Sequence, residues 1–95
     1  MNVIVESNLC IQNRFEPPLS LELPESSRIK DILLYLSGRH IPMNLITPAC
    51  ALNEDIDAMS INGEDFFRLK QGLDTPLNDG DRIQLQLQNV QLGGG

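Results

Sequence analysis

The chain ends in three consecutive glycines, Gly93, Gly94 and Gly95, directly after Leu92. Because glycine has no Cβ, a glycine segment can pass through a narrow channel and bring its backbone close to another protein's catalytic groups. A terminal carboxylate on such a segment is a group that a partner enzyme could activate as an acyl-adenylate. The same residues also fit a frayed chain end or a remnant of cloning. The glycines alone leave both interpretations open.

The other side chains that could do chemistry are few and scattered. His40 is the only histidine and follows a predicted helix end, so catalysis is the less favoured interpretation. Cys10 and Cys50 have no metal-type spacing. Reduced thiols are the default expectation and a disulfide between them is the alternative, with each cysteine buried as a small apolar side chain. The acidic segment 54–57 fits a solvated loop better than a metal site. We therefore expect no catalytic side chain and no bound metal, and a stand-alone enzyme is the least favoured class.

Composition and charge restrict the partners of this chain. Its 95 residues make one domain, and its net charge is −6 with a pI of about 4.5. Such a charge repels phosphate backbones and anionic membranes, so we expect no nucleic acid and no membrane as partner. An acidic domain suits a partner with a basic docking face. The first residues lack the features of a signal peptide, and we expect a cytoplasmic protein.

The elements that must position the glycine segment begin with two strands and a helix. Residues 2–6 are rich in β-branched side chains, and residues 19–23 alternate between leucine and polar residues, which predicts two strands that form a hairpin. Residues 27–37 predict an amphipathic helix, with Ser26-Ser27 as the N-cap candidate and Gly38 as its C-terminal stop. Its apolar stripe consists of Ile29, Ile32, Leu33 and Leu36. The segment 39–55 predicts an irregular connection that contains a short strand or helical turn.

The second half of the chain predicts three further strands. Residues 58–61 form a short strand, and Asn62-Gly63 is typical of a type I′ hairpin turn. Residues 66–69 are the expected returning strand. The turn at 78–81 precedes residues 83–87, whose leucines and isoleucine alternate with glutamines and predict the clearest strand.

This order of elements predicts an α+β fold with a mixed sheet of four to five strands. One helix can cover only one face of that sheet. The expected shared core contains Val5, Leu21, Leu36 and Leu85, and the expected open face carries Ile4, Glu22, Gln84 and Gln86. Phe66 and Phe67 are adjacent, so one of them is expected in the core and the other is a candidate anchor for a partner. That both are at least half buried is the alternative.

Three segments together resemble the ubiquitin-like β-grasp sulfur carriers, which include the small subunit of molybdopterin synthase and the sulfur carrier of thiamin synthesis. They are Ile61-Asn62-Gly63-Glu64, the stretch from Thr75 to Ile83 with its Leu77-Asn78-Asp79-Gly80-Asp81 turn, and the terminal glycines. The resemblance implies a β-grasp domain at 1–89 and a flexible tail at 90–95. The family usually ends in two glycines, so the matching pair is either Gly94-Gly95 or Gly93-Gly94. The 39–55 connection is longer than in the smallest carriers.

The resemblance also implies a mechanism in which partners supply the catalysis. An adenylating, E1-like enzyme would use ATP and magnesium to convert the Gly95 carboxylate to an acyl-adenylate. A persulfide on a sulfur donor would then displace AMP, and reductive cleavage would leave a thiocarboxylate on Gly95. Gly93 and Gly94 would thread through the partner's channel, while Phe67 and Leu92 are candidates for docking. The carrier itself would bind no cofactor.

Three functions remain open from the sequence. The first is a sulfur carrier, with molybdopterin synthesis as the first pathway and thiamin, cysteine or tRNA thiolation as the others. A molybdopterin role implies a stable heterotetramer with a larger catalytic subunit. The second is a protein modifier that forms isopeptide bonds with lysine. The third is a β-grasp interaction module whose tail is inert.

Overall fold

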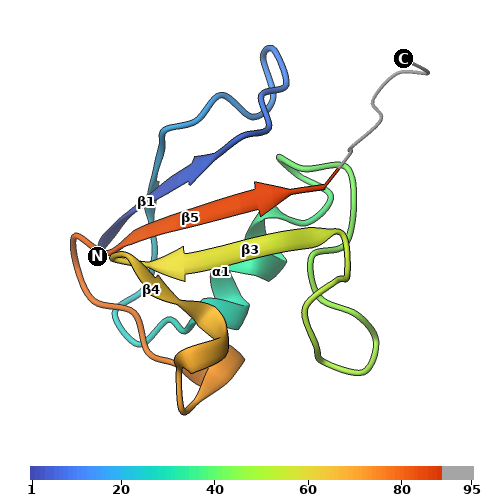
Figure 1. The fold of residues 1–95 in the computed structure, drawn as a ribbon. Coiled ribbons are helices and arrows are strands. Elements are labelled where there is room, and N and C mark those ends of the chain that lie inside the picture. The colour runs from blue at the N-terminus through green and yellow to red at the C-terminus, as the bar shows by residue number, and fades with distance from the viewer. Residues whose placement is uncertain (89–95) are drawn as a thin grey trace.

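The fold consists of one mixed sheet with one helix on one of its faces (Figure 1). It is a computed structural model that describes residues 1–88. The strands and the helix are β1 (Asn2–Ser7), β2 (Leu19–Glu22), α1 (Ile29–Leu36), β3 (Ile56–Ile61), β4 (Glu64–Asp65) and β5 (Arg82–Leu87). Two 3-10 turns, η1 (Phe66–Arg68) and η2 (Gly72–Asp74), separate β4 from β5. The predicted α+β class and the mixed sheet are confirmed.

The strand order places β5 in the middle of the sheet. The order is β2-β1-β5-β3-β4, with β5 parallel to β1 and antiparallel to β3. Val5 lies opposite Ile83, and Met59 lies opposite Leu85. The last predicted strand of the sequence is therefore the central strand of the sheet, with two strands on either side.

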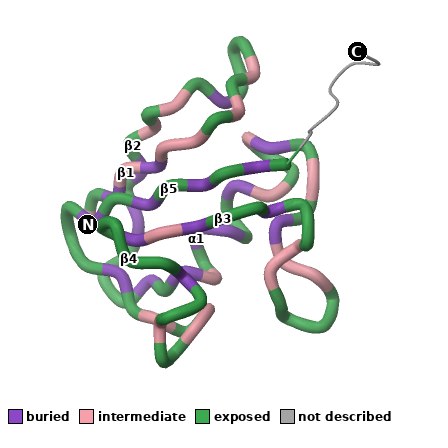
Figure 2. Tube along the Cα trace, in the orientation of Figure 1, coloured by how far each residue is buried: buried purple, intermediate pink, exposed green. Residues whose placement is uncertain are grey.

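The core lies between α1 and one face of the sheet. All four residues of the predicted helix stripe are buried, and so are Val5, Leu21 and Leu85. Along β5, Ile83, Leu85 and Leu87 are buried while the residues between them are exposed, as the alternating colours of that strand show in Figure 2. The predicted polar open face is also confirmed, because Glu22, Gln84 and Gln86 are exposed and Ile4 is half-buried.

The helix begins two residues later than predicted. Ser27 does not cap it, because its hydroxyl donates a 2.8 Å hydrogen bond backward to the carbonyl of Pro24. The Asp31 carboxylate instead accepts from the N–H of Arg28 at 2.8 Å, which satisfies one of the free donors at the helix start. Gly38 has a φ of +77°, as expected of a residue that stops a helix in the left-handed region.

The predicted returning strand at 66–69 is wrong. β4 contains only Glu64 and Asp65, and the chain then turns into η1. The cause is local, because the Asp65 carboxylate accepts from the N–H of Phe67 at 3.0 Å and so initiates a 3-10 turn. The preceding hairpin turn has the predicted geometry, with positive φ values of 52° at Asn62 and 86° at Gly63.

The long connection between α1 and β3 contains no regular helix or strand. Two isolated bridges, Ser37 with Ile41 and Ile46 with Leu52, give it shape. Ile41 and Leu45 are buried against the core, which anchors the connection without regular secondary structure. Within the described residues, no helix has the length and apolar character needed to cross a membrane.

Candidate functional site

The backbone that leads into the glycine segment is held by a side-chain amide at the end of β5. The Leu87 N–H donates to Asn8 Oδ1 at 2.8 Å, and the Leu87 carbonyl accepts from Asn8 Nδ2 at 2.9 Å. β1 ends at Ser7, so the Asn8 side chain continues the ladder where the backbone of β1 has left it. An asparagine amide carries both a donor and an acceptor and can therefore imitate a peptide group.

The other edge of β5 is held by β3 and the residue before it. Ile56 lies opposite Leu87, and the Gln88 N–H donates to the Asp55 carbonyl at 2.9 Å. The register of β3 shifts between Ile56 and Ala58, so an irregularity lies beside the end of β5. The last described residues are thus held from both sides. Leu92 and the glycines Gly93, Gly94 and Gly95 lie outside the described residues.

The start of β5 is fixed by the turn that contributes to the family resemblance. Asp81 is buried, and its carboxylate accepts from the Asn78 N–H at 2.7 Å and from Asn62 Nδ2 at 3.0 Å. Gly80 has a φ of +86°, and its N–H donates to the Asn2 carbonyl at 2.7 Å. The Leu77–Ile83 segment therefore positions β5 against both β1 and the 62–63 hairpin.

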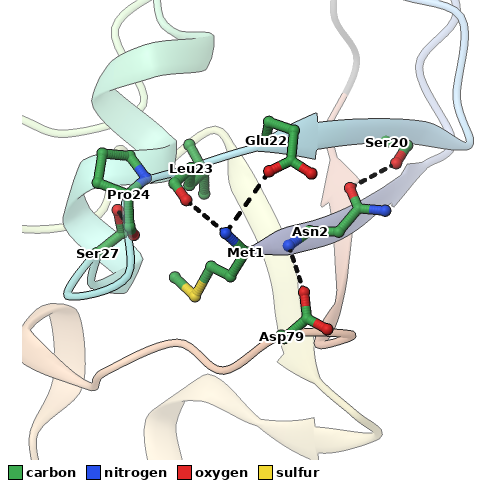
Figure 3. A network of polar contacts seen from close by, with 8 residues as sticks. All are labelled: Met1, Asn2, Ser20, Glu22, Leu23, Pro24, Ser27 and Asp79. Atoms are coloured by element: carbon green, nitrogen blue, oxygen red, sulfur yellow. Dashed lines mark hydrogen bonds and ion pairs between the residues drawn. The ribbon is translucent and has the colours of Figure 1, made fainter.

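A polar network at the start of β1 joins the same turn to the sheet edge (Figure 3). The Asn2 N–H donates to Asp79 Oδ1 at 2.6 Å, and Ser20 Oγ donates to Asn2 Oδ1 at 2.7 Å. The α-amine of Met1 donates to the Leu23 carbonyl at 2.8 Å. These contacts connect β2, β1 and the turn before β5.

The exposed face of the central strands carries a row of polar contacts. Glu6 accepts from Arg82 at 2.7 Å and from Gln84 Nε2 at 2.9 Å, and Ser60 Oγ donates to Gln84 Oε1 at 3.1 Å. The row crosses β1, β5 and β3. This face is therefore polar, and part of its hydrogen-bonding capacity is already used by contacts between its own side chains.

The two adjacent phenylalanines have different environments. Phe66 is 8% exposed and joins the core, whereas Phe67 is 72% exposed, so the alternative that both are half buried is wrong. Phe67 lines a hollow of about 470 Å³ together with Leu52, Ile56 and Leu73. The geometry is compatible with Phe67 as an anchor for a partner, and that function stays a prediction.

Both cysteines differ from their predicted environment. Cys10 and Cys50 are exposed and free, so their expected burial is wrong. Cys10 lies in the segment that joins β1 to β2. Cys50 lies in a turn in which its N–H donates to the Thr47 carbonyl at 2.9 Å. Larger apolar side chains of the same two connections, Phe15 and Leu45, reach the core instead.

The remaining candidate groups do not converge on a reaction centre. His40 Nδ1 lies 3.0 Å from the Arg14 carbonyl, and its ring lies 5.5 Å from the ring of Tyr35. Glu54, Asp55 and Asp57 are exposed. In residues 1–88 there is no group of three metal-ligating side chains. The candidate functional site is therefore the backbone at the end of β5 and not a cluster of side chains.

The sequence did not predict the pair of hydrogen bonds between the Asn8 side chain and the Leu87 backbone, called here the Asn8 clamp. Asn8 occupies a polar stretch without clear periodicity, and its partner is 79 residues away. The one available signal was a side-chain amide directly after a predicted strand, which can extend a ladder by one step.

Comparison of the sequence with protein-family models and with curated proteins finds no match. Comparison with solved structures finds the crystal structure of SAMP1 from Haloferax volcanii, with a TM-score of 0.67. The two chains are 16% identical, and the match covers 100% of each. At this identity the likeness concerns the fold. The chain therefore has the ubiquitin-like β-grasp fold, with a five-stranded mixed sheet and one helix on one face.

Proposed function

We propose that this protein is a sulfur carrier whose Gly95 carboxylate is activated and converted to a thiocarboxylate. The observation that carries the proposal is a β-grasp fold, shared with SAMP1 over the whole of both chains, whose last strand is followed, after five residues, by three glycines. SAMP1 is a small archaeal modifier with a ubiquitin-like fold, so its likeness also favours carboxylate chemistry at the tail.

The arrangement at β5 suits a tail that must enter another protein. The clamp at Asn8 and Asp55 holds the backbone as far as Gln88. Seven residues, 89–95, follow it and span at most about 25 Å when extended. In this proposal, ordering the tail at 90–95 on threading costs about 1–2 kcal/mol for each residue. A docking surface on the folded body must offset that cost.

In this proposal the partners provide the catalysis. An E1-like enzyme consumes ATP with magnesium and forms the acyl-adenylate, and a sulfur donor then supplies the sulfur. A larger catalytic subunit or acceptor enzyme receives the thiocarboxylate, with molybdopterin synthesis as the first pathway to test. Phe67 and Leu92 are the proposed docking residues, and the setting is the cytoplasm.

A second function uses the same activated carboxylate. In a protein modifier, a lysine amine replaces the persulfide as nucleophile, and the product is an isopeptide bond. The likeness to SAMP1 favours keeping this alternative. The two functions differ in their products and can be separated by one measurement.

That measurement is the intact mass and C-terminal fragmentation of the protein after co-production with the adenylating enzyme of its own genome. A sulfur carrier shows an oxygen-to-sulfur exchange localised to Gly95, which a thiol-selective alkylator traps. A modifier shows Gly95 joined to lysine side chains. An unmodified Gly95, under conditions in which the enzyme hydrolyses ATP, would refute both. A chain that lacks Gly95 then decides between the pairs Gly93-Gly94 and Gly94-Gly95.

The fit of the tail to the enzyme is tested with Gly94→Ala. A Cβ at this position should clash in the channel and lower ATP–pyrophosphate exchange by tenfold or more, which is about 1.4 kcal/mol of transition-state binding. Gln91→Ala is the matched control, because that position already carries a side chain. Equal exchange rates for the two variants would contradict the threading step.

A further inference from the structure

The chain offers few amines to an activated carboxylate. Its sequence contains two lysines, Lys30 and Lys70, to which the structure adds the α-amine of Met1. An amine can attack an acyl group only when it is accessible and has released its proton. The contacts of the three amines therefore decide which of them can accept a second copy of the chain.

The α-amine of Met1 is engaged within the sheet. It donates to the Leu23 carbonyl at 2.8 Å and lies 3.6 Å from the Glu22 carboxylate, and the Met1 side chain is 1% exposed (Figure 3). In unstructured peptides the α-amine is the more nucleophilic amine near neutral pH, because a smaller fraction of it is protonated. Here the α-amine is engaged by Leu23 and Glu22, and a nucleophilic attack would first have to break these contacts.

Lys30 is engaged in an ion pair. Its Nζ lies 3.1 Å from Asp74 Oδ1, and Arg28 lies 3.7 Å from the same oxygen. The side chain of Lys30 is 45% exposed, so the pair is worth little in stability. It nevertheless directs the amine toward η2, and a nucleophilic attack would first have to break the pair.

Lys70 is exposed and lies on an ordered turn between η1 and η2. The backbone on either side is held, because the Leu69 N–H donates to the Phe66 carbonyl at 3.0 Å and the Gly72 N–H to the Leu69 carbonyl at 3.3 Å. Leu69 packs against the core and anchors the turn. Within residues 1–88, no ion pair or side-chain hydrogen bond engages the Lys70 amine, unlike those of Met1 and Lys30.

We propose that Lys70 is the acceptor amine through which one copy of this chain is joined to the Gly95 carboxylate of another. The proposal rests on the activation of Gly95 described above. The neutral Nζ of Lys70 attacks the Gly95 carbonyl carbon of an acyl-adenylate formed from ATP by the adenylating enzyme. A C–N bond forms, the C–O bond to AMP breaks, and AMP leaves with the electron pair. The amine's proton passes to solvent, and the product is an isopeptide-linked dimer that can be extended.

The placement of Lys70 favours a link between copies over closure within one copy. Figure 1 shows the turn that carries η1 and η2 at the lower edge of the molecule, whereas β5 ends toward the upper right. A Lys70-linked copy would still present its own end of β5. Chains could therefore grow by repeating the same bond.

The test uses the full chain with the adenylating enzyme of its genome, ATP and magnesium, followed by peptide mapping of the conjugates. Lys70→Arg should lower the yield of dimer by about tenfold or more, because arginine keeps its proton and cannot attack. Lys30→Arg is the matched control and should leave the yield within about twofold of the wild-type value. A link mapped to Lys30 or to the Met1 amine would overturn the proposal, and so would closure within one copy.

A second arm separates this proposal from the proposed function. A full-length chain that carries a chemically installed thioester on Gly95, made through an intein fusion, needs no enzyme. Dimers linked at Lys70 in this arm support the acceptor site even if the enzyme arm forms no adenylate, in which case the proposed function fails alone. Dimers linked elsewhere, or no dimer in either arm, refute the acceptor site.

Discussion

Removal of the Asn8 amide should loosen the end of β5 without disturbing the core. Asn8→Ala deletes two hydrogen bonds to the Leu87 backbone, of 2.8 and 2.9 Å, both partly buried. A neutral hydrogen bond contributes about 0.5–1.5 kcal/mol net, so the pair predicts a loss of about 1–3 kcal/mol in the free energy of unfolding. The upper half of that range is favoured because both Leu87 groups lose their partner while they remain partly covered.

The assay for this prediction is urea unfolding followed by circular dichroism, with hydrogen exchange at the Leu87 amide as a local readout. Asn8→Asp keeps an acceptor for the Leu87 N–H but loses the donor to its carbonyl, and should fall between Asn8→Ala and the wild type. Gln12→Ala is the surface control, because Gln12 is exposed and its side chain makes no hydrogen bond within residues 1–88. A free energy of unfolding for Asn8→Ala within about 0.5 kcal/mol of this control would refute the clamp.

Four further substitutions test the parts of the fold that lead to the end of β5. Phe67→Ala should change the free energy of unfolding by less than about 0.5 kcal/mol and weaken binding of the adenylating enzyme. Phe66→Ala should lower the free energy of unfolding by about 3–5 kcal/mol. Urea unfolding measures both stabilities, and calorimetry measures the binding. Asp81→Ala removes two hydrogen bonds, including the one from Asn62, and should cost about 1–3 kcal/mol, and an unchanged denaturation midpoint would contradict this. Gly63→Ala places a Cβ at a φ of 86° with open space around it, and a thermal unfolding scan should show a loss of about 1 kcal/mol from backbone strain alone.

Hydrophobic periodicity and turn residues predicted much of the fold correctly. The helix stripe from Ile29 to Leu36 and the alternation in β5 placed the core correctly, because each pattern matches the period of only one kind of secondary structure. Asn62-Gly63 predicted a turn with two positive φ values, which is the conformation it has. The alternation at 83–87 also predicted the strand that the structure shows as β5.

The failures have local causes. Ser26-Ser27 was expected to supply the helix N-cap, but Arg28 occupies that position and the Ser27 hydroxyl donates to the Pro24 carbonyl. The strand predicted at 66–69 turns into η1 because the carboxylate of Asp65 captures the N–H of Phe67. Cys50 was expected in the core, yet it lies in a turn that never reaches it. In each case a single polar contact or loop path prevailed over residue-type preference.

The sequence by itself determined the class of fold, the faces of its strands and helix, and the chemistry to look for at Gly95, because these depend on residue type and spacing along the chain. Only the tertiary structure decided which side chains hold the last strand and which amines are engaged. The partner of Asn8 is 79 residues away, and the contacts of Lys30 and of the Met1 amine also cross between elements. Such pairings form when distant segments pack, so no local pattern can encode them.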